Sequence, residues 1–148
     1  IHLIDNKKIS NPENHRSNYF HLTGLVRLAL CGHDLEEDAR FTYNDIVKLG
    51  EECFGNFHGG YMLADIVHAV TDEKGKNRSE RKNEKYYKEL KENKLAVFVK
   101  LADLSANTLF SKLTGSSMYE KYKKEFPKFK EKVYIEEYEE FFNYVENL

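Results

Sequence analysis

The stretch LAVFVKLADL, residues 95–104, is the most hydrophobic window of the chain, and it decides the fold class. Only Lys100 and Asp103 interrupt its apolar residues, and Asn107 follows shortly after them. A continuous apolar run of this length is typical of a helix that is buried on most of its sides. We therefore expect this stretch to be the central helix of a helical bundle.

The rest of the chain also has helical patterning. No segment alternates apolar and polar residues over the length of a strand, which predicts an all-α fold. Residues 25–31 are apolar nearly all round, and Thr23 stands in the position of an N-cap. Residues 1–21 contain Pro12 and many polar side chains, so we expect most of them to form a loop. Further helices are expected over residues 62–70, 118–129 and 133–148.

Glycines and charged residues mark the expected loops. Thr42 precedes a short amphipathic helix that we expect to end at Gly50. Gly55, Gly59 and Gly60 are expected in the loop that follows it. The later segment DEKGKNRSERKNEK carries no apolar side chain. It is either a solvated loop that leads into a helix or an element that binds an anion.

Composition narrows the class of protein. The 148 residues are expected to form one domain with a sizeable core. The chain has 23 Lys and Arg residues and 25 Asp and Glu residues. This balance argues against nucleic-acid binding that is driven by net positive charge. No apolar run approaches the roughly 20 residues that span a bilayer, and no signal peptide is expected before the charged opening. Cys31 and Cys53 lack the spacing of a zinc site or a disulfide framework, which favours a cytoplasmic setting.

The stretch HDLEED, which starts at His33, contains candidate metal ligands. The imidazole of His33 and the carboxylate of Asp34 form a nitrogen and oxygen donor set that suits Mn²⁺, Fe²⁺ or Zn²⁺. Glu37 lies four residues after His33, and Asp38 lies four residues after Asp34. On a continued helix each would lie one turn along, where it could hold and deprotonate a water molecule bound to the metal. Glu36 is expected to be a solvated residue at a helix end.

Asp103 is a further candidate ligand. Inside so apolar a window, its carboxylate would cost several kcal/mol in desolvation unless a cation or hydrogen-bond donors faced it. Lys100, three residues earlier, could supply a simple helical ion pair, and a metal ion is the alternative. The residues around Asp103 do not decide between the two. Asn107 lies four residues later on the same face of the helix.

The blocks HDLEED, FTYNDIVKLG, AVTDEKGKNRSERK and VKLADLSAN together resemble the HD-domain metal-dependent phosphohydrolases of the RelA/SpoT type. The resemblance is strongest to the stand-alone small hydrolases of the alarmone ppGpp, and it covers residues 22–112 in order and spacing. It implies a single HD-domain helical bundle over residues 1–148. The sequence opens at Ile1 without the basic and aromatic residues that the family carries there, so we expect the N-terminal helix of the domain to be missing.

The family binds one Mn²⁺ through a first His, a His-Asp pair and a later Asp, and the resemblance places another divalent metal as the alternative cofactor. Glu37 and Asp38 match the Glu-Asp pair that activates the attacking water in the family. By resemblance the metal ligands are His2, His33, Asp34 and Asp103. By resemblance the substrate-binding residues are Asn107, Lys82, Arg81 and Lys100.

The resemblance implies a cytoplasmic hydrolase that removes the 3′-pyrophosphate from guanosine tetraphosphate and pentaphosphate alarmones. Its partner would be a small nucleotide, with no nucleic acid and no membrane, and a homo-oligomer stays open. One alternative is an HD hydrolase of another nucleotide, with a deoxy, cyclic or modified structure. A second alternative is a non-catalytic HD domain that binds a nucleotide or a partner helix through the Tyr- and Lys-rich C-terminal region.

Overall fold

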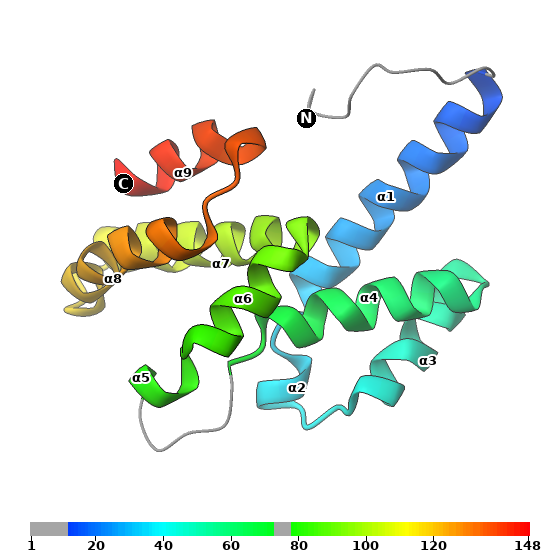
Figure 1. Ribbon diagram of the computed structural model, residues 1–148, viewed down its shortest axis with the longest axis horizontal. Helices are drawn as coiled ribbons and strands as arrows, with labels where there is room; N and C mark the ends of the chain where they lie inside the picture. Colours follow the sequence, from blue (N-terminus) through cyan, green and yellow to red (C-terminus); the bar gives the residue numbers. More distant parts are fainter. Residues whose placement is uncertain (1–11, 73–77) are drawn as a thin grey trace.

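The computed structural model describes residues 12–72 and 78–148, and within these ranges it is an all-α bundle without β-strands (Figure 1). The predicted fold class is therefore confirmed. None of the helices in the described part is both long and apolar enough to cross a bilayer. The helices in chain order are α1 (Pro12–Gly32), α2 (Leu35–Asp38), α3 (Tyr43–Phe54), α4 (Phe57–Val70), α5 (Arg78–Arg81), α6 (Glu84–Glu92), α7 (Lys94–Leu113), α8 (Met118–Val133), the short 3-10 helix η1 (Glu136–Tyr138) and α9 (Glu139–Glu146).

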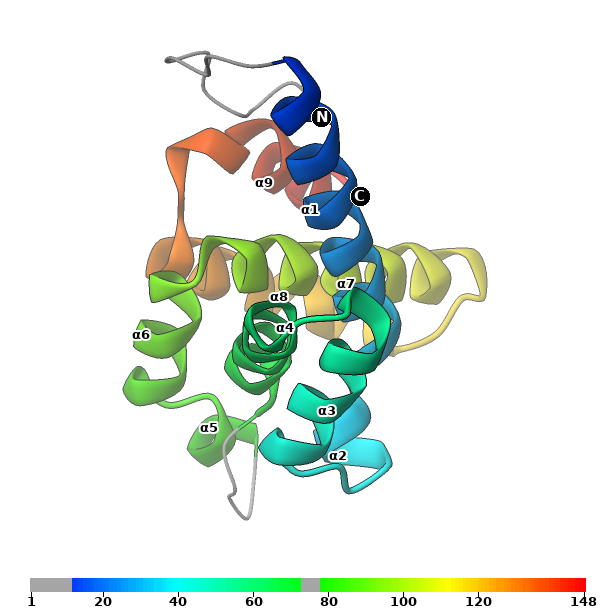
Figure 2. The same ribbon diagram turned by 90° about the vertical axis from the view of Figure 1, so that its right-hand side faces the viewer.

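Helices α4 and α7 form the centre of the bundle. Figure 2 looks along α4, with α3, α6 and α7 around it, and α1 also packs against it. Helix α7 contacts α1, α4, α6, α8 and α9, and Val97, Val99 and Leu101 on it are fully buried. The predicted central helix is confirmed, and it extends beyond the apolar window to Leu113.

The buried apolar side chains form one continuous cluster to which α1, α3, α4, α6, α7, α8 and α9 contribute. Aromatic rings fill the part of the cluster between α8 and α9. Phe126, Phe129 and Phe142 lie with their ring centroids 6.1 to 6.4 Å apart. This separation is typical of aromatic side chains packed in a core. Helices α8 and α9 thus pack on each other through aromatic side chains.

The expectation of a polar loop up to residue 21 is wrong in its second half. Helix α1 begins at Pro12, and Thr23 lies inside the helix rather than at its start. Proline suits the first turn of a helix, because its ring presets φ and no N–H is needed there. A polar composition therefore did not indicate a loop in this segment.

The expectation that Gly50 ends a helix is also wrong. Helix α3 runs through Gly50 to Phe54, and Gly55 ends it with a left-handed φ of 68°. Gly59 and Gly60 lie inside α4 rather than in a loop. A Cβ atom placed on Gly50 would lie 2.7 Å from the Cα of Gly60, so the two glycines mark a close crossing of α3 and α4.

Side-chain caps define where several helices begin. Thr42 accepts a hydrogen bond from the N–H of Asp45, and the Asp45 carboxylate accepts one from the N–H of Thr42 at 2.9 Å. This capping box confirms the predicted start of α3. Asn93 ends α6 and also begins α7, where its side chain accepts a hydrogen bond from the N–H of Ala96 at 3.1 Å.

Replacing Asn93 with alanine is expected to lower the free energy of unfolding by about 1 kcal/mol, because the first turn of α7 loses its side-chain acceptor. Chemical denaturation followed by circular dichroism measures the change. The matched control is Ser117→Ala, since Ser117 precedes α8 without a side-chain cap hydrogen bond. Equal losses in the two variants would show that the Asn93 cap contributes nothing.

Candidate functional site

The candidate site lies where the end of α1 meets the middle of α7. His33 follows α1 directly, and Asp103 lies on α7. The Nε2 atom of His33 is 3.1 Å from Oδ2 of Asp34 and 3.5 Å from Oδ1 of Asp103. The fold therefore brings together three of the predicted metal ligands from two distant segments of the chain.

The His33 ring is held in one orientation by a backbone carbonyl. Its Nδ1 atom lies 2.8 Å from the carbonyl oxygen of Leu30. A carbonyl oxygen only accepts, so Nδ1 carries a proton and donates it. In the neutral ring the lone pair of Nε2 then faces the Asp34 and Asp103 carboxylates. One imidazole nitrogen and two carboxylates so arranged form a donor set of the kind that binds a divalent cation.

Asp103 also has partners on its own helix. Its Oδ2 atom is 3.1 Å from Nζ of Lys100, and the amide of Asn107 donates to its Oδ1 at 2.5 Å. The side chains of Asp103 and Lys100 are only 16% and 10% exposed. The helical ion pair considered from the sequence is therefore present. It coexists with the His33 contact, because the two interactions use different carboxylate oxygens.

The acidic residues after His33 do not continue the first helix. The chain turns at His33 and Asp34, and the single-turn helix α2 follows. The N–H of Asp38 still donates to the carbonyl of Asp34 at 2.8 Å, so the expected spacing of one turn is kept. Oε1 of Glu37 accepts a hydrogen bond from the N–H of Asp72 at 2.8 Å. Glu37 is thereby tied to the chain that follows α4.

The expectation that Glu36 is solvated is wrong. Its side chain is 14% exposed, and Oε2 lies 3.1 Å from Nδ1 of His68 on α4. The physical reason is tertiary: α2 packs against α4, so this residue faces protein rather than water. The contact fastens the start of α2 to the centre of the bundle.

Asp72 and Tyr86 are part of the site's surroundings that the sequence did not indicate. Among the described residues, Oδ1 of Asp72 and the hydroxyl of Tyr86 are buried without a hydrogen-bond partner. Nζ of Lys82 lies 4.0 Å from Oδ1 of Asp72. Burial raises the pKa of the Tyr86 phenol, and the nearby carboxylates of Asp72, Glu37 and Asp103 raise it further. Tyr86 is therefore an uncharged hydroxyl beneath an acidic cluster.

Among the other residues predicted for the site, Lys82 and Arg81 lie in the described part of the chain and His2 does not. Lys82 lies just after α5 and extends toward Asp72, and Arg81 is half-buried at the end of α5. His2, the predicted first metal ligand, lies outside the described residues. His21 lies on α1 twelve residues before His33. At about 1.5 Å per residue this is roughly 18 Å along the helix axis, too far for both to bind one ion.

The donor atoms fit a divalent cation in kind. Within residues 12–72 and 78–148, no group of three or more His, Cys, Asp and Glu side chains is placed so that it could hold a metal ion. The ring nitrogen of His33 nevertheless lies 3.1 Å from the carboxylate of Asp34 and 3.5 Å from that of Asp103. This mixed set suits Mn²⁺, Fe²⁺ or Zn²⁺. Among the described residues, Oδ1 of Asp72 accepts no hydrogen bond, and the ammonium group of Lys82 lies 4.0 Å from it.

Comparison with protein-family models, curated proteins and solved structures finds no match for this chain. The functional interpretation therefore depends on the chemistry of the site and on the sequence motifs described above.

Proposed function

We propose that the chain is a Mn²⁺-dependent phosphohydrolase that acts on a nucleotide, with guanosine tetraphosphate and pentaphosphate alarmones as its substrates. The observation that carries the proposal is the orientation of His33. Its Nδ1 is bound to the Leu30 carbonyl, so Nε2 faces the carboxylates of Asp34 and Asp103. A bound cation would be coordinated by these groups and would balance the charge of the two carboxylates. The class of reaction is inferred from the resemblance to HD hydrolases.

His33, Asp34 and Asp103 would hold the ion, together with His2 by resemblance. When bound, a divalent cation supplies positive charge that stabilises phosphoryl oxygens and makes water more acidic. Lys100 and Asn107 are positioning residues in this scheme, since both hold the Asp103 carboxylate in place.

Glu37 is the proposed proton acceptor. Because Oε1 is held by the N–H of Asp72, the carboxylate has a defined orientation and Oε2 can take a proton from water. Water then adds to the phosphorus attached to the ribose 3′ oxygen, and the bond between that phosphorus and oxygen breaks. The 3′ oxygen takes up the proton that Glu37 removed from water. The products are pyrophosphate and the nucleoside 5′-diphosphate from the tetraphosphate, or the 5′-triphosphate from the pentaphosphate. Lys82, near Asp72, provides positive charge for the phosphate groups.

Replacing Glu37 with glutamine is expected to slow turnover by roughly 100-fold or more while the metal content is unchanged. The amide oxygen can still accept from the N–H of Asp72, but it cannot take a proton from water. Steady-state kinetics with metal analysis of the same sample measures both quantities. Glu52→Gln is the control, because Glu52 is an exposed acid on α3. Loss of the metal from the Glu37 variant would make Glu37 a ligand instead.

A panel of nucleotides incubated with the protein and Mn²⁺ tests the proposed function, with the products separated by chromatography. We expect pyrophosphate release from the guanosine alarmones. If only deoxy, cyclic or modified nucleotides are hydrolysed, the proposed substrate is wrong but the proposed class of reaction is retained. No turnover together with low metal content would favour a domain that binds its ligand without catalysis.

We also propose a cytoplasmic setting. Cys31 and Cys53 are both exposed free thiols. Exposed thiols persist in a reducing compartment, whereas secreted proteins tend to pair them.

A further inference from the structure

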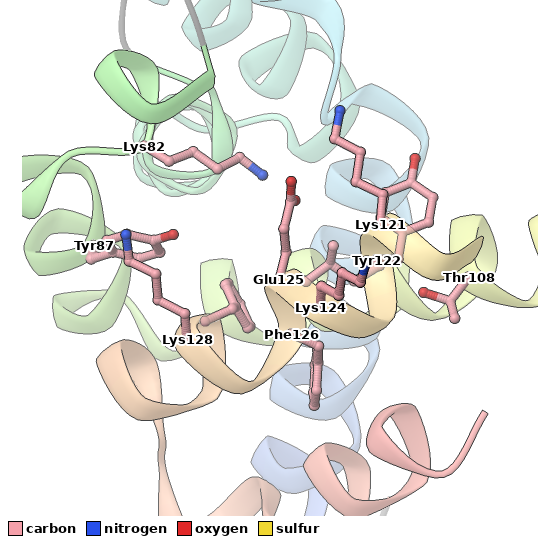
Figure 3. A pocket seen from close by; sticks show the side chains of 11 residues that line it. Lys82, Tyr87, Thr108, Lys121, Tyr122, Lys124, Glu125, Phe126 and Lys128 are labelled. Carbon is pink, nitrogen blue, oxygen red and sulfur yellow. The ribbon is translucent and has the colours of Figure 1, made fainter. Parts of the chain in front are cut away.

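A pocket of about 390 Å³ lies between α7 and α8, with Tyr87 of α6 also in its wall (Figure 3). This volume falls within the range of roughly 300–1,000 Å³ that is usual for small-molecule sites. The apolar part of its lining is formed by Tyr87, Leu104, Phe126 and Phe129. The rings of Tyr87 and Phe129 lie with their centroids 6.5 Å apart, so this part of the lining is aromatic and largely fixed by the core.

The rim of the pocket is basic. Lys121, Lys124 and Lys128 recur at helical spacing along one face of α8 and are exposed, and Lys82 reaches in from the opposite side. Glu125 is the one acidic residue of the lining, and Figure 3 shows Lys82 directed toward it. The lining as a whole therefore carries a clear excess of positive charge.

Of the six lysines of α8, Lys132 pairs with Glu84 of α6 at 3.0 Å, and the other five fall into two groups. Lys123 donates to the carbonyl of Glu146, and Lys130 forms an ion pair with the Glu146 carboxylate at 2.6 Å. Among the residues that the structure describes, Lys121, Lys124 and Lys128 form no ion pair. The lysines that face α9 are thus engaged in holding the fold, whereas those at the pocket keep their ammonium groups for a ligand.

The pocket and the candidate metal site use neighbouring residues of α7. Leu104 and Thr108, which line it, directly follow Asp103 and Asn107 on α7. Successive residues of a helix are about 100° apart around its axis, so the pocket occupies the face next to the one that carries Asp103. Lys82 belongs to the pocket lining and also lies 4.0 Å from Asp72. A ligand with one end at Asp103 can therefore place its other end against α8.

We propose that this pocket binds the non-reacting half of the nucleotide, with the ring on the apolar lining and the distal phosphates on Lys121, Lys124 and Lys128. The inference rests on the proposed function for the position of the reacting phosphate at Asp103. Ammonium groups bind phosphate oxygens through charge-assisted hydrogen bonds, and aromatic walls suit a planar ring. The substrate class that fits both places is a nucleotide with phosphate groups at two positions. Helix α8 lies beyond residues 22–112, which resemble the alarmone hydrolases, so this half of the site belongs to the C-terminal region.

Isothermal titration with guanosine 5′-diphosphate tests the pocket without any turnover. The combined variant Lys121→Gln, Lys124→Gln, Lys128→Gln is expected to bind at least about tenfold more weakly than the unaltered protein. The control variant is Lys48→Gln, Lys88→Gln, Lys91→Gln, which removes the same charge from exposed positions outside the pocket. The control is expected to keep the affinity of the unaltered protein. Inorganic pyrophosphate, which lacks the ring, is expected to bind more weakly than the nucleotide.

Equal affinities in the two triple variants would overturn the inference, as would an absence of nucleotide binding by the unaltered protein. Binding of a single-stranded oligonucleotide through the same lysines, without binding of the mononucleotide, would also overturn it and would indicate a nucleic-acid surface. The two proposals fail separately. If the protein hydrolyses alarmones and the triple lysine variant does so equally well, only the proposal for the pocket is rejected. If nucleotide binding depends on the three lysines but no hydrolysis occurs, only the proposed enzymatic function is rejected.

Discussion

Asp103→Ala is expected to abolish Mn²⁺-dependent hydrolysis and the binding of the metal. The variant removes one of the two carboxylates that face Nε2 of His33. It also leaves Lys100, whose side chain is 10% exposed, without its ion-pair partner. An unpaired buried charge costs about 3 kcal/mol, so the free energy of unfolding is expected to fall as well. Activity, metal content and denaturation midpoint are therefore measured together.

The double variant Asp103→Ala, Lys100→Met separates the two effects. Removing the ammonium group as well as the carboxylate leaves no unpaired charge, so most of the lost stability is expected to return. Hydrolysis and metal binding are expected to stay absent, because the ligand is still missing. His33→Ala should likewise lose activity while the Lys100 ion pair is kept. Full hydrolysis by the stable double variant would exclude Asp103 from the site.

Gly60→Ala is expected to be the most destabilising single-methyl change in the fold. A Cβ atom on Gly60 would lie 2.5 Å from the carbonyl oxygen of Val47 and 2.9 Å from Cγ of Glu51. Both groups belong to α3, so the helices must separate to make room. Overpacking of this kind costs about 3 kcal/mol, which for a chain of this size lowers the melting temperature by roughly 10 °C.

Gly24→Ala is the matched control for the helix crossing. Gly24 is also inside a helix, but its Cβ would meet only the ring of Phe54 at 3.5 Å, an ordinary contact distance. Alanine is the better helix former by up to about 1 kcal/mol, so this variant is expected to be neutral or stabilised. Similar melting temperatures for the two variants would contradict the tight contact between α3 and α4.

The parts of the fold that the sequence predicted are those set by local patterns. The apolar window identified α7, and Thr42 identified the start of α3 through its own hydrogen bonds. Gly50 and Gly60 were misinterpreted because their role is set by a partner helix, which no local pattern shows. Pro12 was misinterpreted because the same residue both interrupts and begins helices.

Some residues of the candidate site could likewise be predicted from local patterns, and others could not. His33 and Asp103 could be singled out because each is a polar residue beside a strongly apolar run, and the structure places them together. Tyr86 gave no signal, because an aromatic residue at helical spacing is ordinarily core. Asp72 lies at the edge of a segment without apolar side chains, where burial of one carboxylate oxygen is not visible in the sequence. Burial among other segments, which raises the pKa of the Tyr86 phenol, is not visible in a local pattern.

Helix α2 has no buried residue, and the hydrogen-bonded side chains of Glu36 and Glu37 attach it to α4 and to the chain beyond it. A segment held in this way adds little to global stability and can open without unfolding of the core. Natural variation at Glu37 or Asp38 would therefore change the chemistry at almost no cost to folding. Asp103 lies in the core helix, so evolution could alter it only together with Lys100. If the proposed activity is present, a descendant of this chain would be expected to lose it first at α2.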